Sequence, residues 1–404
     1  MAGEARRAAE AAARASYGRL LAATVRRTRD IAAAEDALAD AFRAAVEQWP
    51  ATGVPDRPEA WLLTVARRAH GRDARRRGVA EAAADTLAVL ADGMGEDAPD
   101  GFPDRRLALM FVCAHPALDR AVHTPLMLQA VLGLDAARIA AAFLAAPATV
   151  GQRLVRAKAK IRDAGIAFAV PEPDRIADRL DAVLDAVYVA YGASWDDVTG
   201  ADPKRRGLAA EALYLARLLA ELCPDQPETH GLLALILYCE ARAAARRVDG
   251  AFVPIDRQDI ALWSRPMIAE AEGHLRHAAA AARFGRFQTE AAIQSLHVEA
   301  RVSGRGHDEA LILFYDLLAQ HRPSLGVAVA RAAAYGRRSP ADGLALLDGF
   351  AGPAVAAYQP YWATRAHLER LAGRDAAASY ARAIGLSDDP AVRRFLADAG
   401  AAGG

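Results

Sequence analysis

The stretch LDAARIAAAFLAAPATVGQRLVRAKAKIRDAG, from Leu134 to Gly165, decides the fold class of this chain because it predicts two helices joined by a tight turn. Asp135 is a suitable N-cap for the first helix. Pro147 interrupts the pattern, since proline has no N–H to continue the helical hydrogen bonds. The apolar positions expected to be buried are Ile139, Phe143 and Leu144 in the first helix and Val150, Leu154, Ala157 and Ile161 in the second.

The other face of the second helix is polar and mostly basic, and it has no acidic residue before Asp163. In a helix-turn-helix the second helix enters the major groove, where its N-terminal residues reach base edges and its later basic residues neutralise phosphates. The same pattern also suits an αα-hairpin with a solvated charged face, and this stretch alone does not separate the two interpretations. The residues of this face are Gln152, Arg153, Arg156, Lys158, Lys160 and Arg162.

Length and composition limit the remaining possibilities. A chain of 404 residues is long enough for about two or three domains, and its formal net charge of zero provides no overall field that would attract nucleic acid. The three cysteines are too few and too scattered for a disulfide framework, and they suit a reducing cytoplasm. Cys113 and His115 form an isolated C-x-H without a second pair of ligands, so we expect no metal site.

The pattern along the whole chain predicts an all-α protein. Alanine, leucine and arginine dominate, and the alternation typical of strands is absent. No apolar run reaches membrane-spanning length, and the N-terminal segment is interrupted by arginine and glutamate, unlike the apolar core of a signal peptide. We therefore expect a cytoplasmic protein without membrane association.

A proline-containing loop, PATGVPDRP at 50–58, separates two predicted helices near the N-terminus. The helix before it, residues 31–49, is expected to begin at the cap Asp30, to end at Pro50 and to carry acidic side chains. The helix after it contains Trp61 and becomes strongly basic. Six arginines against one acid are more than a helix dipole requires, so the segment predicts a phosphate-binding surface, with a solvated helix end as the alternative. The arginines are Arg67, Arg68, Arg72, Arg75, Arg76 and Arg77.

An acidic segment follows the arginine-rich helix. Residues 81–103 contain no lysine or arginine, and glycine and proline gather in their second half, which is typical of a flexible linker. Two further helices are expected near 105–115 and 118–132, and they lead into the helix-turn-helix.

In this order, the N-terminal segments resemble two regions of the extracytoplasmic-function (ECF) sigma factors, which are subunits of bacterial RNA polymerase. Residues 17–77 resemble sigma region 2 through RDIAAAEDALADAFRAAVEQWP and GVPDRPEAWLLTVARRAHGRDARRR. Residues 104–165 resemble sigma region 4 through FVCAHPAL and IAAAFLAAPATVGQRLVRAKAKIRDAGI. The resemblance implies a region 2 domain at 1–80, the linker at 81–103 and a region 4 domain at 104–166.

The resemblance also implies roles for the region 2 residues. Glu35, Asp36 and Asp40 would bind the clamp helices of the polymerase β′ subunit. The loop and the Trp-led helix would separate the strands of the −10 element, since an unpaired base can leave the stack and enter a protein pocket. The arginine helix would hold the single-stranded backbone, while Trp61 would suit a core position equally well. The −10 candidates are Asp56, Arg57, Trp61, Arg67, Arg68, Arg72 and Arg75.

Region 4 would read the −35 element as duplex DNA and contact the polymerase β flap. The first turns of its second helix supply base-reading candidates, and later positions supply phosphate contacts. The acidic linker would occupy the RNA path of the polymerase, because a negatively charged chain mimics RNA. The −35 candidates are Thr149, Gln152 and Arg153 for bases and Arg156, Lys158 and Lys160 for phosphates.

A short linker, 167–174, leads to an extension over 175–404 in which helices alternate with proline or glycine breaks. The segment YQPYWATRAHLERLAGRDAAASYARAIGL, from Tyr358 to Leu386, resembles a tetratricopeptide repeat (TPR), whose helical hairpins stack into an α-solenoid. The stretches RRGLAAEALYLARLLAELCPDQPETHGLLALILYCEARAAAR, LWSRPMIAEAEGHL and RFQTEAAIQSLHVEA resemble the TPR-like extension of one ECF subgroup. That subgroup carries a segment ending Asn-Glu-Gly-Tyr, whereas this chain has Gly192, Ala193, Ser194 and Trp195.

The extension shows no nucleophile–base pair and no phosphate-binding loop, so we expect neither an enzyme nor a cofactor. His274 and His277 are expected to form a surface pair, and Trp263, Arg265 and Glu270 either line a groove or pack internally. The extension would modulate the sigma modules or bind a peptide or small-molecule signal. The sequence thus predicts a promoter-specificity subunit, with a helical-repeat scaffold or a DNA-binding regulator without polymerase engagement as the alternative.

Overall fold

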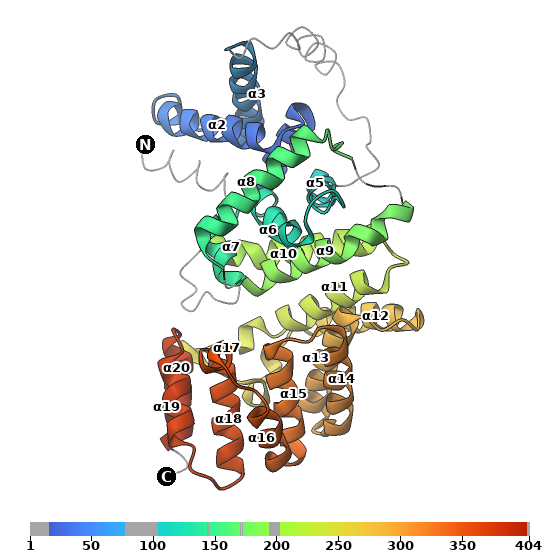
Figure 1. Ribbon diagram of the computed structural model, residues 1–404, viewed down its shortest axis with the longest axis vertical. Coiled ribbons are helices and arrows are strands. Elements are labelled where there is room, and N and C mark those ends of the chain that lie inside the picture. Colours follow the sequence, from blue (N-terminus) through green and yellow to red (C-terminus); the bar gives the residue numbers. More distant parts are fainter. Residues whose placement is uncertain are drawn as a thin grey trace. The chain divides into compact units, whose positions relative to one another are not determined.

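A computed structural model describes residues 16–76, 104–143, 145–169, 171, 173–193 and 203–401 (Figure 1). These residues are almost entirely helical, which confirms the predicted all-α fold. The only sheet within them is a short antiparallel hairpin of β1 (Arg247–Val248) and β2 (Ala251–Phe252), which the sequence did not predict. The predicted linker 81–103 lies outside the described residues, as do Ser194 and Trp195.

The chain divides into two compact units. The first contains residues 1–195 and 203–218, and the second contains residues 196–202 and 219–404. This division does not coincide with the predicted linker at 167–174, because α9 (Pro173–Ala193) and most of α10 (Pro203–Leu222) belong to the first unit.

The first unit begins with a helix at 16–28, followed by α2 (Ile31–Thr52) and α3 (Pro58–Arg76), which pack against each other. Asp30 caps α2 as predicted, since its carboxylate accepts hydrogen bonds from the first backbone N–H groups of the helix at 2.9 and 3.2 Å. The apolar stripe of α2 is buried at Leu38 and Trp49.

The prediction that α2 ends at Pro50 is wrong. Pro50 lies inside the last turn, and the helix continues to the cap residue Gly53. Gly53 has a φ of 83°, a conformation that costs glycine nothing, and its N–H donates to the Trp49 carbonyl at 2.9 Å. The loop is therefore shorter than predicted and covers residues 53–57.

The predicted helix-turn-helix is present as α7 (Ala136–Ala142) and α8 (Pro147–Asp163), which pack on each other and on α6 (Arg120–Ala130). Asp135 accepts a hydrogen bond from the Arg138 N–H at 2.9 Å, as expected of a cap. Phe143 falls after the end of α7 and is exposed, contrary to expectation, and Leu144 lies outside the described residues. The other predicted apolar positions are buried: Ile139, Val150, Leu154, Ala157 and Ile161.

The helices beyond the predicted linker complete this unit. α9 packs on α5 (Arg105–Cys113) and α6. Arg106 is buried and binds the Asp104 carboxylate, with Nε 2.9 Å from Oδ2, and it also pairs with Glu211 of α10. Its guanidinium lies 5.0 Å from the Tyr214 ring centroid. A buried charge that is fully paired in this way fixes the position of α10 on α5.

The second unit is a succession of helices in which neighbours along the chain pack against each other (Figure 1). Such nearest-neighbour packing is the arrangement expected of a helical-repeat extension. Its first α-helix is α11 (Pro227–Glu240), and three short 3-10 helices follow at Ala243–Ala245, Ile255–Arg257 and Ile260–Leu262. The later α-helices are α12 (Arg265–Ala280), α13 (Arg286–Ser303), α14 (Asp308–His321), α15 (Leu325–Arg338), α16 (Pro340–Asp348), α17 (Pro353–Ala356), α18 (Gln359–Leu371), α19 (Ala377–Gly385) and α20 (Pro390–Ala401).

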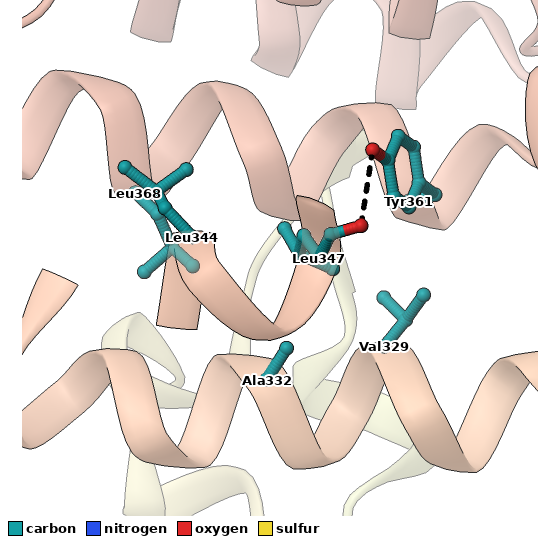
Figure 2. Packing of buried hydrophobic residues seen from close by; sticks show 6 residues of the cluster. All are labelled: Val329, Ala332, Leu344, Leu347, Tyr361 and Leu368. Atoms are coloured by element: carbon teal, nitrogen blue, oxygen red, sulfur yellow. Dashed lines mark hydrogen bonds between the residues drawn. The ribbon is translucent and has the colours of Figure 1, made fainter. Parts of the chain in front are cut away.

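A cluster of buried side chains joins α15, α16 and α18 (Figure 2). The helices approach closely because glycines occupy the crossing points. A Cβ atom on Gly343 would lie 2.7 Å from the Ala332 carbonyl oxygen and 2.8 Å from the Gly336 Cα. The Tyr361 hydroxyl donates to the Leu347 carbonyl at 3.4 Å in the same cluster. Its members are Val329, Ala332, Leu344, Leu347, Tyr361 and Leu368.

Gly343→Ala should lower the free energy of unfolding of the second unit by about 1–3 kcal/mol, because the added methyl group overpacks the contact with backbone atoms. The measurement is native-state hydrogen exchange of the α15 and α16 amides in the full chain. Gly273→Ala is the matched control, since no atom lies within 4 Å of its added Cβ and alanine favours a helix interior. Equal protection in the two variants would contradict the prediction.

Candidate nucleic-acid interface

The polar face of α8 is open to solvent near its N-terminus. Five of the six residues predicted to contact −35 DNA have exposed side chains, and the apolar face of the helix is covered by the rest of the module. Pro147 occupies the first turn, and no side chain caps the helix. The polar face of α8 is therefore accessible from its first turns onward. The exposed residues are Thr149, Gln152, Arg153, Arg156 and Lys160.

Lys158 does not belong to this exposed face. It is buried, and its Nζ lies 2.7 and 2.6 Å from the two carboxylate oxygens of Glu35 on α2. The prediction that Lys158 contacts phosphate is therefore not met in this arrangement. The reason is spacing: Lys158 lies four residues after Leu154 and three before Ile161, which places it on the buried side of the helix.

The same contact occupies Glu35, which was predicted to bind polymerase. The Glu35 side chain is 22% exposed. Burial raises the pKa of its carboxyl, while the Lys158 ammonium acts in the opposite direction by attraction and hydrogen bonding. Burial is also the larger cause of a raised pKa at Tyr17, with the Glu35 charge adding to it. Glu35 is thus a packed residue of the first unit rather than an open acidic contact.

The other two predicted polymerase contacts differ from Glu35. Asp36 is exposed, and Asp40 is on the border of exposure and accepts a hydrogen bond from Arg43 at 2.8 Å. Since such a pair near the surface contributes little to stability, it does not prevent Asp40 from binding another group.

The −10 candidates lie along the loop and α3. Asp56 and Arg57 are exposed at the loop, and Arg67, Arg68 and Arg72 are exposed along the helix. The side chain of Arg75 is outside the described residues.

Trp61 is half-buried against Trp49. Their ring centroids are 5.4 Å apart with an interplanar angle of 61°, which is an edge-to-face contact. Trp61 thus anchors α3 on α2, and part of its surface remains accessible beside the loop. This position is compatible with a role of Trp61 at the −10 element and also with a role as a core anchor.

In the second unit, His274 and His277 on α12 are not simply a surface pair, because both rings pack against His230 of α11. Their centroids lie 5.2 and 4.2 Å from that of His230. Since a carbonyl oxygen only accepts, His230 Nε2 donates to the Pro224 carbonyl at 3.0 Å, and its Nδ1 accepts from His274 Nδ1 at 2.9 Å. Sequence reasoning missed His230 because it lies 44 residues before His274.

The described residues contain no group of three or more His, Cys, Asp or Glu side chains that could hold a metal ion. Within the same part of the chain, no helix is both long and apolar enough to cross a bilayer. Trp263, predicted either to line a groove or to pack, is buried.

Comparison with known proteins places the chain in a family. It is 36% identical over 387 residues to the uncharacterized protein R00370 of Rhizobium meliloti (strain 1021), and the match covers 93% of this chain and 91% of that protein. This chain belongs to the same family as R00370. Residues 179–279 also match the model of DUF6596, a family of unknown function. No solved structure matches the chain.

The DUF6596 match extends across both compact units. It contains most of α9 and all of α10, which belong largely to the first unit, and the three histidines of α11 and α12, which belong to the second. The matched segment therefore connects the helix-turn-helix module to the start of the helical extension.

Acidification should destabilise the packing of α11 on α12. The pKa of His230 is lowered, first by burial and then by the neighbouring His277 and His274, although its hydrogen bond to Pro224 opposes this. A histidine whose pKa is lower in the folded chain binds its proton less readily there, so its contribution to stability is complete above about pH 6.5 and declines as the pH falls. The melting temperature should therefore drop between pH 7.5 and pH 5.

The contribution of the histidine cluster is isolated by substitution. His274→Gln keeps a neutral hydrogen-bond donor for His230 but removes a neighbouring imidazole that lowers the pKa of His230, so the fall in melting temperature should be smaller than in the unmodified chain. His321→Gln, at an exposed position on α14, should leave the fall unchanged. Identical pH profiles of the melting temperature for all three proteins would refute the assignment of this pH dependence to the histidine cluster.

Proposed function

We propose that this chain is a promoter-specificity subunit of bacterial RNA polymerase of the ECF sigma type. In this proposal residues 16–76 bind the polymerase β′ clamp helices and the opened −10 element. Residues 104–166 read the −35 element as duplex DNA and contact the β flap. The helical extension modulates both activities in the cytoplasm.

One observation carries the proposal. The second helix of the helix-turn-helix keeps Gln152 and Arg153 exposed in its first turns, while its apolar side is buried by other helices. Glutamine and arginine at that place are the side chains that read adenine and guanine edges in the major groove. An amphipathic structural helix would also have a covered apolar side, but it would not require base-reading side chains exposed in its first turns.

The arrangement of α2, the 53–57 loop and α3 favours polymerase engagement over a simple DNA-binding regulator. The loop presents Asp56 and Arg57 directly before a helix with exposed arginines, and Trp61 lies at its base. A regulator that binds only duplex DNA through α8 has no need of this second cationic surface. The helical-repeat scaffold remains the alternative, since a scaffold would need neither surface.

The decisive experiment is reconstitution with core RNA polymerase. The chain should form a complex with the core enzyme that retains a template whose −10 region is unpaired. A chain that binds neither the core enzyme nor DNA would support the scaffold, and one that binds duplex DNA but not the core enzyme would support the regulator.

Arg153→Ala should reduce discrimination among −35 sequences by about 1–3 kcal/mol, because a bidentate contact to a base edge is lost. Lys160→Ala should weaken binding to all sequences alike and reduce the slope of log affinity against log salt by about 1, because it removes a phosphate contact. The measurement is fluorescence anisotropy with a set of duplexes at several salt concentrations.

Arg43→Ala is the charge-matched control for both variants, since it removes an exposed arginine of α2 that is assigned to neither proposed DNA surface. It should change neither the sequence preference nor the salt slope. Similar effects of all three substitutions would show that α8 has no special role.

A further inference from the structure

The helix proposed to read the −35 element and the helix proposed to bind polymerase contact each other directly in the first unit. Lys158 of α8 and Glu35 of α2 form a doubly hydrogen-bonded ion pair in which the lysine side chain is 8% exposed. At the end of the same helix, Arg162 Nη1 lies 3.8 Å from Asp30 Oδ2, at the cap of α2. Two basic residues of α8 therefore face two acidic residues of α2.

A second contact joins the same two modules at a different place. The helix at 16–28 lies on the turn that follows α6, where a Cβ atom on Gly18 would lie 2.0 Å from the Val131 carbonyl oxygen. Gly133, with a φ of 66°, faces the Tyr17 ring, whose Cδ1 would lie 3.2 Å from an added Cβ. Glycine at both positions permits an approach of backbone to helix that any larger side chain would prevent.

The ion pair has a consequence for both of its members. A carboxylate whose two oxygens both accept hydrogen bonds from a buried lysine is not available to a protein partner. In the same way, that lysine is not available to a phosphate. If the two groups separated while still buried, each would be an uncompensated charge inside the protein, which is costly. The pair therefore breaks only when the two helices move apart and water reaches both side chains.

We propose that α2 and α8 hold the first unit in a closed state in which Glu35 and Lys158 mask each other, and that binding of polymerase through Glu35 or of a phosphate through Lys158 requires this contact to open. The inference rests on the proposed function for the role of the two surfaces. The closed state itself is a property of the chain and can be tested without polymerase.

The test of the closed state is a distance measurement on the full chain. Spin labels on Ala39→Cys of α2 and Ala148→Cys of α8 occupy exposed positions, while the three native cysteines, Cys113, Cys223 and Cys239, are buried. Double electron–electron resonance should give one narrow distance. Glu35→Gln should broaden the distribution toward longer distances, and the exchanged pair Glu35→Lys with Lys158→Glu should restore the narrow one.

Asp36→Asn is the matched control, because it removes the neighbouring acid, which is exposed. It should leave the distance distribution unchanged. A distribution in Glu35→Gln that equals that of the unmodified chain would overturn the proposal, as would a broad distribution in the unmodified chain. Circular dichroism of each variant checks that the helices remain folded.

Binding to a duplex of random sequence then separates this inference from the proposed function. Glu35→Gln frees Lys158, so affinity should rise about threefold to tenfold and the salt slope should steepen by about 1, as expected for one more phosphate contact. Asp36→Asn removes the same charge without freeing a lysine, and an equal rise in both variants would refute the masking. An opened Glu35→Gln chain that binds no DNA would refute the proposed function while the closed state stands.

Discussion

A helix with one apolar stripe is stable in water only when another element covers that stripe, and this requirement explains most of the architecture. In the first unit, α8 buries Val150, Leu154 and Ile161 against its own module, while α9 covers α5 and α6. The helix-turn-helix is therefore not complete at residue 166. In the segment predicted to be a separate extension, α9 packs on α5 and α6, and Glu211 of α10 pairs with Arg106 of α5. The compact unit accordingly continues to residue 218.

A comparable requirement applies to buried charged side chains. An ionised side chain leaves water only when a partner and hydrogen bonds compensate it, and the first unit shows two such cases. Arg106 is compensated by Asp104 and Glu211, which joins residues far apart in the sequence. Lys158 is compensated by Glu35. In each case the pair specifies which helices meet, because a mismatched neighbour would leave the charge unpaired.

The sequence was sufficient for features that depend on local spacing. The cap at Asp135, the turn at Pro147 and the buried stripe of α8 follow from rules that act over three or four residues. The same rule places Lys158 on the Leu154–Ile161 side, but a lysine is rarely buried without a charged partner, and spacing does not reveal that Glu35 is this partner. The roles that the sigma resemblance implies for the exposed residues of α3 and α8 stay predictions, because they concern binding partners and not the packing of this chain.

Contacts between segments that are far apart along the chain could not be predicted from the sequence. Nothing in the spacing of His274 and His277 indicates that His230 completes the cluster, because that depends on how α11 crosses α12. The β1–β2 hairpin is too short for a periodic signal, with strands of two residues each. The prediction at Pro50 is wrong because the helix closes one turn later, where the Gly53 N–H donates to the Trp49 carbonyl.

The chemistry of the α2–α8 contact suits a surface that must separate. Apolar side chains of similar volume at positions 35 and 158 would hold the helices together at least as well, since a buried ion pair gives little net stability over such a replacement. Once the helices are apart, however, such side chains would expose apolar surface on both α2 and α8. Glutamate and lysine are well solvated when separated, and each retains a charge that another partner can pair. An ionic contact therefore allows the closed and the open arrangements to be close in free energy, which a purely apolar interface between the same helices would not.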